Sequence, residues 1–232
     1  MRIHHAVGVE GARAARGVVV VIDVLRAFTV SAYAFAGGAR ECLLVKTVDE
    51  ARELAAHTPG AVLSAEVDGL PVPGIAISNS PTQMRKADVR ERSVIQRSSS
   101  GTQAISAVPI GQPIYAASLV VARATAQACL LREPEVVTLV ASADYPEDYA
   151  CAGYIESMLT GAAPSTEQLL QPLFDSPRYR ELAAGGWPGF PANDLELALV
   201  ADVFDFAMPA VRSDLFVRLT KQAPQTSRAA AV

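Results

Sequence analysis

The chain has 232 residues, of which 50% are hydrophobic, 19% charged and 6% aromatic, so it can bury a substantial core and lacks the composition of a disordered protein. Its formal net charge is -4 and its sequence holds no run of lysine and arginine. These properties argue against a nucleic-acid-binding protein and favour small-molecule partners.

Strands and helices are predicted to alternate over the first 160 residues. The run from Val18 to Asp23, VVVVID, is typical of a strand buried on both faces, and the small and apolar residues 25–35 suit a packed helix. Further strands are predicted at residues 42–46, 61–65, 93–97, 113–117 and 136–141. Further helices are predicted at residues 49–56, from about Ser80, and at 102–107, 119–131 and 147–159. The alternation predicts an α/β fold with three α/β/α layers and a mostly parallel or mixed central sheet.

The sequence after residue 160 is richer in turn-forming residues and short helical patches. It predicts a helical C-terminal part, residues 161–232, packed on the α/β core of residues 1–160, which carries the site, so that the chain forms a single domain overall. Within this part we expect a helix at residues 195–206 and a short strand or extended piece at 215–219. The alanine-rich apolar surface is compatible with a homodimer.

Cysteine usage and hydropathy predict a cytoplasmic protein without membrane contact. Cys42, Cys129 and Cys151 are far apart and form no CxxC motif, which favours reduced thiols over disulfides or a zinc site. We expect no signal peptide, because the N-terminus lacks an apolar core, and no uninterrupted apolar stretch reaches the roughly 18 residues of a membrane helix. His4 and His5 fit a solvated pair better than a metal site, because His57 is the only other histidine.

The segment VIQRSSSGT at residues 94–102 carries the strongest local signal. An apolar run ends in Arg97 and continues into three hydroxyl side chains and a glycine. A strand that enters a turn of small residues and then a helix can direct backbone N–H groups and hydroxyls at an anion. The segment therefore predicts a phosphate or sulfonate site, with a helix cap as the structural alternative.

Other polar residues are predicted at the same edge of the sheet. Ligands of open α/β sheets bind beyond the carboxyl ends of the strands. The residues predicted there are Asp23, Arg26, Glu66, Asp68, Arg97 to Thr102, Ser118, Asp144, Glu147 and Asp148. Carboxylates that face an anion loop need a cation between them, and oxygen ligands beside a phosphate favour Mg²⁺. This combination suits phosphoryl transfer, which depends on positioning and charge neutralisation.

Each of these residues also has a structural interpretation. Asp23 could cap the following helix, and Asp144 and Glu147 have the spacing of a capping box. Arg26 could form a local ion pair with Asp23 one helical turn away. Residues 79–81, Asn-Ser-Pro, are a natural helix start. Their joint placement at strand ends favours the functional interpretation.

Several segments together resemble a known family. In this order and spacing, VVVVIDVLRAFTV, SAEVDGLPVPGIAISNSP, RSSSGTQAI and PEDYACAGYI are similar to the 2-phosphosulfolactate phosphatases, the ComB-like family. The resemblance covers about residues 1–160. The matching positions are Asp23, Arg26, Glu66, Gly74, Asn79, Ser80, Pro81, Gly101, Thr102, Glu147, Asp148, Cys151 and Gly153.

The resemblance implies a Mg²⁺-dependent hydrolase that converts (2R)-O-phospho-3-sulfolactate, a small anionic phosphate ester, into 3-sulfolactate and phosphate on a route to coenzyme M. It implies Asp23, Glu66 and Asp148 as Mg²⁺ ligands. The catalytic residues would be Asp23, Asp148 and Glu147, the last of which would orient the attacking water. The anions would be bound by Arg26, Asn79, Arg97, Ser98, Ser99, Ser100, Gly101, Thr102 and Ser118.

The chain also departs from the family pattern. Ser100 replaces a usual Asn, Gln103 a usual Arg, Ala65 a usual Gly and Val121 a typical Asn. Two lost contacts to charged groups would shift substrate preference by about two orders of magnitude, which Arg97 would offset in part. The alternative function is therefore a catalytically weak homologue that binds an anionic metabolite or a protein partner.

A phosphatase of the haloacid-dehalogenase type, with Asp23 as nucleophile, fits poorly. That chemistry requires a second aspartate two residues further on, and Leu25 occupies the position.

Overall fold

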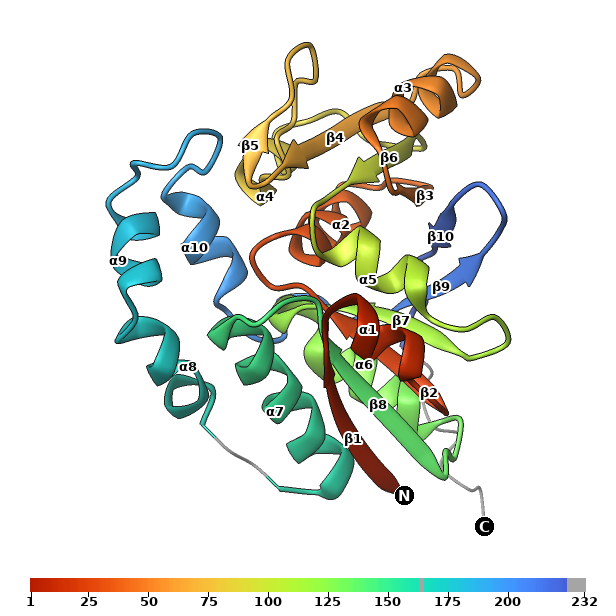
Figure 1. Cartoon of the computed structure of the whole chain (residues 1–232), viewed down its shortest axis with the longest axis vertical. Helices are drawn as coiled ribbons and strands as arrows, with labels where there is room; N and C mark the ends of the chain where they lie inside the picture. The colour runs from red at the N-terminus through yellow and green to blue at the C-terminus, as the bar shows by residue number, and fades with distance from the viewer. Residues whose placement is uncertain (163–164, 225–232) are drawn as a thin grey trace.

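The computed structural model describes residues 1–162 and 165–224 (Figure 1). The strands are β1 (Arg2–Val7), β2 (Val18–Ile22), β3 (Glu41–Val45), β4 (Val62–Val67), β5 (Leu70–Pro71), β6 (Ser93–Arg97), β7 (Ile114–Ala117), β8 (Val136–Ala141), β9 (Met208–Arg212) and β10 (Val217–Leu219). The helices are α1 (Gly8–Ala14), α2 (Ala27–Ala36), α3 (Val48–Ala56), α4 (Pro81–Met84), α5 (Gly101–Ala107), the 3₁₀ turn η1 (Leu119–Val121), α6 (Ala122–Leu130), α7 (Pro146–Thr160), α8 (Thr166–Phe174), α9 (Pro177–Ala183) and α10 (Asn193–Ala198).

All ten strands form one mixed sheet in the order β1-β8-β2-β7-β9-β10-β3-β6-β4-β5. The pairs β1–β8, β8–β2, β2–β7, β3–β6 and β6–β4 are parallel. The hairpin β9–β10 lies between these two parallel groups, and it pairs antiparallel with β7 on one side and β3 on the other. The α/β fold with a mostly parallel sheet is therefore confirmed, and its mixed character comes from the C-terminal hairpin and from the antiparallel pair of β4 and β5.

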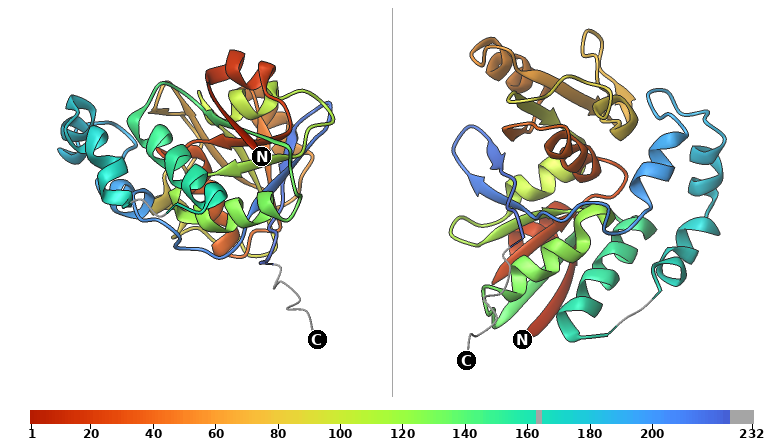
Figure 2. Two further views of the ribbon diagram at one scale, coloured as in Figure 1. Left: turned by 90° about the horizontal axis from the view of Figure 1, so that it is seen from below. Right: turned by 180° about the vertical axis from the view of Figure 1, so that it is seen from behind.

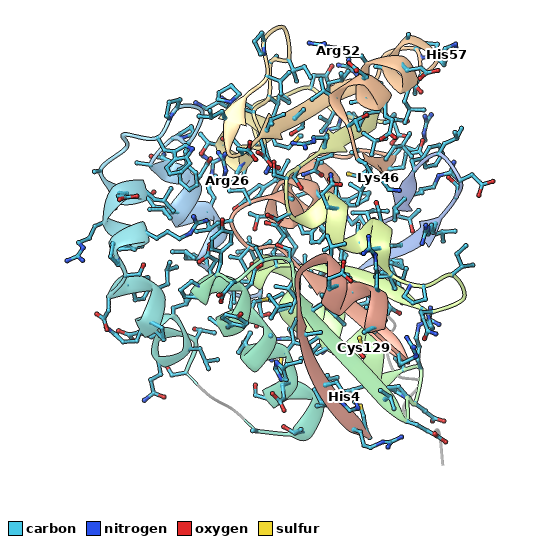
Figure 3. All side chains as sticks on the ribbon, in the orientation of Figure 1. His4, Arg26, Lys46, Arg52, His57 and Cys129 are labelled. Carbon is cyan, nitrogen blue, oxygen red and sulfur yellow. The ribbon has the colours of Figure 1, made fainter. Side chains whose placement is uncertain are left out.

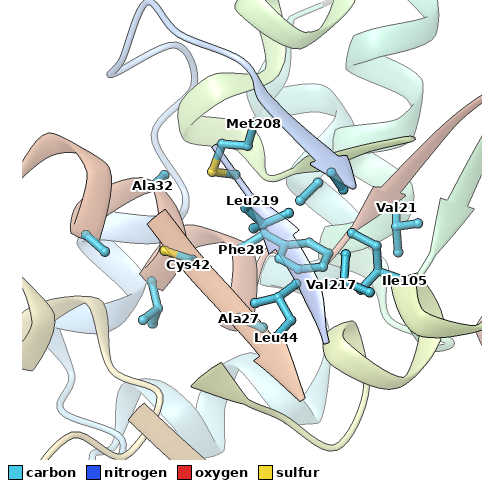
Figure 4. Packing of buried hydrophobic residues seen from close by; sticks show 14 of the residues in the cluster. Val21, Ala27, Phe28, Ala32, Cys42, Leu44, Ile105, Met208, Val217 and Leu219 are labelled. Atoms are coloured by element: carbon cyan, nitrogen blue, oxygen red, sulfur yellow. The ribbon is translucent and has the colours of Figure 1, made fainter. Parts of the chain in front are cut away.

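The residues of β2 show how the sheet is covered on both faces. Val19 and Val21 belong to the core cluster that α1, α2 and α5 complete, part of which is shown in Figure 4. Val18, Val20 and Ile22 belong to the cluster that α6, α7 and α8 complete. Every residue of β2 is buried, as the continuous run of β-branched residues predicts for a central parallel strand.

Three strands have no counterpart in the sequence-based prediction, and one of them is the two-residue strand β5. β1 is an edge strand with the sequence RIHHAV, and it is mostly exposed, so it lacks the apolar run that marks a buried strand. β9 has the sequence MPAVR, and Pro209 argues against a strand because proline cannot donate a backbone hydrogen bond to a neighbouring strand. The expected strand near residues 215–219 is present as β10.

The predicted helix at residues 195–206 is wrong from residue 199 onward, because α10 ends at Ala198. Asp202 adopts a positive φ of 58°, and its backbone N–H donates to the carbonyl of Leu119 at 3.0 Å. Its carboxylate accepts the backbone N–H of Arg123 at 2.8 Å. These bonds attach the chain to the start of α6 instead of continuing the helix.

Helices α8, α9 and α10 follow α7 along one side of the molecule, and the chain then returns to the middle of the sheet as β9 and β10 (Figures 1 and 2). The C-terminal part thus supplies two kinds of structure: rim helices beside the sheet and a hairpin inside it. α10 contacts α4, which follows β5 in the chain. The rim helices therefore reach the carboxyl end of the sheet.

Within residues 1–162 and 165–224, no helix combines the length and apolar character needed to cross a membrane. The three cysteines are free and buried, and burial raises the pKa of each thiol. His4 and His57 lie far apart (Figure 3), and the His5 ring nitrogen lies 2.7 Å from a Glu156 carboxylate oxygen.

Candidate active site

A cavity of about 380 Å³ lies beyond the carboxyl ends of β2, β4 and β6, between the sheet and the rim helices. Its walls are formed by Asp23, Leu25, Arg26, Glu66, Asp68, Gly69, Asn79, Ser99, Ser100, Tyr145, Arg178, Leu182, Trp187 and Phe190. A hollow of about 420 Å³ beside α6 is lined mainly by alanine and leucine side chains and by residues 222–224. Because acidic, basic and hydroxyl groups meet only in the first of these two, we take that cavity as the candidate site.

Asp23 follows β2 directly and is almost fully buried at the inner end of the cavity. One carboxylate oxygen accepts the backbone N–H of Ala27 at 2.9 Å, and Gly101 lies close to the other oxygen. Burial is the main reason that the pKa of Asp23 rises to about 6, and the negative charges of Glu66 and Glu147 raise it further. Asp23 therefore bonds to the first residue of α2, although the N-cap of that helix is Arg26, and Asp23 also lines the cavity.

Glu66 joins β4 to the serine loop that follows β6. Its two carboxylate oxygens accept the backbone N–H of Ser99, the Ser99 hydroxyl at 3.2 Å and the Gly69 N–H at 2.6 Å. The side chain is buried and lines the cavity beside Asp23. The structure thus brings together two carboxylates that are 43 positions apart in the sequence.

Asp148 lies behind Asp23 and is absent from the cavity wall. Its carboxylate accepts the N–H of Val24 at 2.8 Å, and from Ser142 the N–H at 3.1 Å and the hydroxyl at 3.0 Å. Burial raises its pKa well above the ordinary value, and the charge of Asp23 adds to the effect. Asp148 holds the chain after β2 to the chain after β8.

Glu147 is fully buried and pairs with Arg178. One of its oxygens accepts from both Nε and Nη2 of Arg178 at 3.2 Å, and the other is buried without a hydrogen bond from any described residue. Burial raises the pKa of Glu147, against the opposing effect of Arg178. The capping-box alternative is not realised, because Tyr145 is the N-cap of α7 and Asp144 accepts the Tyr149 hydroxyl.

The serine loop divides into structural and cavity-facing residues. Ser98 and Thr102 are buried and bond to each other: the Ser98 N–H donates to the Thr102 hydroxyl at 2.9 Å, and the Thr102 N–H donates to the Ser98 hydroxyl at 3.0 Å. Ser99 and Ser100 line the cavity. Ser100 is the N-cap of α5 but forms no side-chain capping bond, so its hydroxyl is not committed to the helix.

Arg97 holds the loop together and does not line the cavity. Its guanidinium donates to the carbonyls of Lys46 and Glu66 and to the Ser99 hydroxyl. Ser118 also lies outside the cavity wall, and its buried hydroxyl has no hydrogen-bond partner among the described residues.

Asn79 lines the cavity and is supported by a buried polar side chain below it. Its side-chain oxygen accepts from Gln96 at 3.0 Å, and Gln96 also donates to the carbonyl of Ala27 at 2.7 Å. The hydroxyl of Ser31 donates to the Gln96 side-chain oxygen at 2.6 Å. This network connects Asn79 to the start of α2, close to Asp23.

Arg26 lines the cavity and is held by the rim helices rather than by Asp23. Its Nη1 donates to Asp194 at 2.9 Å and to the carbonyl of Gly189 at 2.7 Å, and its guanidinium lies 4.3 Å from the centre of the Phe190 ring. Figure 3 shows Arg26 between α10 and β5. The expected local ion pair is replaced by a pair with a residue 168 positions away.

Sequence reasoning missed the residues that the rim helices and the loop between α9 and α10 contribute to the site: Arg178, Leu182, Trp187 and Phe190 in the cavity lining, and Asp194 as the partner of Arg26. The indole N–H of Trp187 donates to the carbonyl of Gly69 at 3.3 Å, so the rim bonds directly to the turn after β4. The sequence signals here are a Ser-Pro helix start before Arg178 and turn-forming residues around Trp187, which do not show the direction in which these side chains point.

Within the described ranges no cluster of three or more His, Cys, Asp or Glu side chains has the geometry of a metal site. Asp23 and Glu66 nevertheless line one wall of the cavity, and the charge of Glu66 raises the pKa of Asp23. Mg²⁺ at phosphate-binding sites is commonly held by one or two carboxylates, with substrate oxygens and water as the other ligands. The Asp23–Glu66 pair fits that coordination.

A glycine is required where the serine loop approaches Asp23. A Cβ on Gly101 would lie 2.5 Å from a carboxylate oxygen of Asp23 and 3.1 Å from the Cβ of Ala27. We expect Gly101→Ala to displace the carboxylate and to cost about 1–3 kcal/mol of stability, measurable by denaturant unfolding. Gly186→Ala is the control, because a Cβ there meets no atom within 4 Å. Equal behaviour of the two variants would contradict the requirement.

A three-layer α/β fold with a carboxylate- and guanidinium-lined cavity beyond the strand ends is typical of a site for a small polar ligand. The sequence model of a family described as 2-phosphosulpholactate phosphatase matches residues 4–176. The chain belongs to this family and is accordingly a phosphoric monoester hydrolase.

Individual relatives agree with the family match. The chain is 36% identical over 179 residues to a probable 2-phosphosulfolactate phosphatase of Bacillus subtilis, a match that covers 68% of the chain and 78% of that protein. It is 31% identical over 224 residues to a protein of the same name from Pseudothermotoga lettingae, covering 89% and 93%. A third relative of that name, from Carboxydothermus hydrogenoformans, is 36% identical over 144 residues, covering 61% of the chain and 60% of that relative.

Proposed function

We propose that the chain hydrolyses 2-phosphosulfolactate to 3-sulfolactate and inorganic phosphate, with Mg²⁺ as cofactor. The observation that carries this proposal is that carboxylates and guanidiniums meet in one cavity: Asp23 and Glu66, which we call the carboxylate wall, and Arg26 and Arg178, which we call the guanidinium wall. A substrate with a phosphate and two further acidic groups needs both a metal-binding side and a guanidinium side. The family and its relatives carry the name of this activity.

Asp23 and Glu66 would hold the metal, while Asp148 supports the backbone after Asp23. When bound, Mg²⁺ would polarise a phosphoryl oxygen and neutralise charge on the phosphate. Ser99, Ser100 and Asn79 also line the cavity and supply hydroxyl and amide groups for hydrogen bonds. Trp187, Phe190 and Leu182 add apolar surface to the lining of the cavity.

The proposal is tested by phosphate release from a panel of small phosphoesters that includes 2-phosphosulfolactate and 2-phospholactate. We expect turnover in the presence of Mg²⁺, its loss on addition of EDTA, and its recovery when Mg²⁺ is restored in excess. Turnover that EDTA leaves unchanged would contradict the metal requirement. Absence of turnover of every ester, combined with binding of 3-sulfolactate, would support the alternative of a catalytically weak anion-binding homologue.

The cytoplasmic location, the homodimer and the place on a route to coenzyme M stay predictions from the sequence.

A further inference from the structure

Arg178 reaches the cavity from α9, a helix that begins at Pro177, directly after the last residue of the family match. Its guanidinium lies 3.9 Å from the centre of the Tyr145 ring, and its side chain is 27% exposed, so it is partly accessible from the cavity that it lines. A face-on contact with an aromatic ring and a carboxylate partner together fix the plane of a guanidinium.

Glu147, the partner of Arg178, is buried, and an ionised carboxylate without a partner is unfavourable in the protein interior. Glu147 is 0% exposed, and Arg178 supplies the hydrogen bonds to one of its oxygens through Nε and Nη2. The remaining nitrogen of Arg178, Nη1, forms no hydrogen bond within residues 1–162 and 165–224. The pair thus presents an oriented donor to the cavity.

Arg26 is held in the same manner from the other side. Its Nη1 bonds to the buried carboxylate of Asp194, whereas Nε and Nη2 form no hydrogen bond with the described residues. Two guanidinium groups, each anchored by a buried carboxylate, therefore line the same cavity as the carboxylates of Asp23 and Glu66. If the phosphate and its cation lie at Asp23 and Glu66, a second acidic group of the substrate can pair with the guanidiniums.

We propose that Arg178 is a specificity-determining residue that binds an acidic group of the substrate other than the phosphate, and that Glu147 positions it. This inference rests on the proposed phosphatase function. It assigns a ligand to the guanidinium groups of the same cavity. It gives Glu147 a role different from orienting the attacking water. The family match covers residues 4–176, so the inference places substrate selection on a segment outside the matched residues.

The test compares the binding of two products by calorimetry, 3-sulfolactate and inorganic phosphate, in the presence of Mg²⁺. Arg178→Gln should weaken 3-sulfolactate binding about 10- to 100-fold, the value of a hydrogen bond to a charged group, and leave phosphate binding unchanged. With 2-phosphosulfolactate as substrate, the loss should appear mainly in KM. Arg180→Gln is the matched control, because Arg180 lies on the same helix, is exposed and is absent from the cavity wall.

Glu147→Gln separates the two roles of Glu147. If it positions Arg178, the variant weakens 3-sulfolactate binding and raises KM in the same direction as Arg178→Gln. If it orients water, kcat falls while product binding is unchanged, which would overturn its positioning role. Equal weakening of both products by Arg178→Gln, or none, would overturn the role of Arg178. Failure of the wild-type enzyme to turn over 2-phosphosulfolactate would count against the proposed function alone, since the binding comparison does not require turnover.

Discussion

Replacement of Asp23 by asparagine should lower kcat with 2-phosphosulfolactate by about 100- to 1000-fold, the usual effect of removing one charge-stabilising group from an active site. The asparagine side chain would keep an oxygen for the N–H of Ala27 but lose the negative charge at the inner end of the cavity. The control is Asp144→Asn, which makes the same change at another strand end, where the side chain lies outside the cavity wall. Wild-type turnover by the Asp23 variant would exclude it from the metal site.

The raised pKa of Asp23 adds a second, activity-independent measurement. Folding raises this pKa from 3.8 to about 6, so the native protein binds more protons than the unfolded chain between these pH values. The free energy of unfolding of metal-free protein should therefore fall as pH rises through this interval, and the fall should be smaller for Asp23→Asn. A divalent cation that neutralises the carboxylates should raise the Tm of the wild type at a pH of about 8 and leave that of the variant nearly unchanged.

The carboxylate wall of the site was predictable from sequence because it depends on one topological rule. Asp23 and Glu66 directly follow or end parallel strands, and Ser99 and Ser100 follow a third, so their convergence at one edge requires only that the strands be parallel. The sequence does not show whether a polar side chain at that edge faces the ligand or the backbone. Arg97 and Ser98, for example, were both predicted to bind an anion, but their side chains form hydrogen bonds within their own loop.

The guanidinium wall was not predictable in the same way. Arg26 was identified, but its partner Asp194 lies in a helix of six residues after a turn-rich segment, where hydrophobic periodicity is too short to assign a face. The direction of Arg178 could not be predicted either, because α9 has only seven residues and carries a second arginine, Arg180, that is exposed. Only tertiary packing distinguishes the two.

The hairpin β9–β10 explains why the rim helices can hold the site at all. Because it lies in the middle of the sheet between β7 and β3, both ends of the segment from α8 to α10 are attached to the core. At one end α7 and α8 pack together, and at the other the hairpin completes the sheet. Residues that approach the cavity from this segment are therefore fixed to the same core that holds the strand-end carboxylates.

The largest stability effect is expected at the ion pair that anchors this rim. Arg26 is 4% exposed and Asp194 is 0% exposed, and the second oxygen of Asp194 accepts the Ser80 hydroxyl at 2.7 Å and the Thr82 N–H at 3.0 Å. Asp194→Ala removes these acceptors and leaves a buried guanidinium without its carboxylate. We expect a loss of about 3–5 kcal/mol in the free energy of unfolding, measured with denaturant.

A double variant distinguishes the buried charge from simple loss of packing. Arg26→Met combined with Asp194→Ala removes both charges and should recover part of the stability that Asp194→Ala alone loses, because the uncompensated guanidinium is gone. Glu10→Ala, which breaks the exposed pair with Arg13, should change stability by less than about 1 kcal/mol. If the double variant is less stable than Asp194→Ala, the cost arises from lost contacts around Asp194 and the unpaired charge is not its cause.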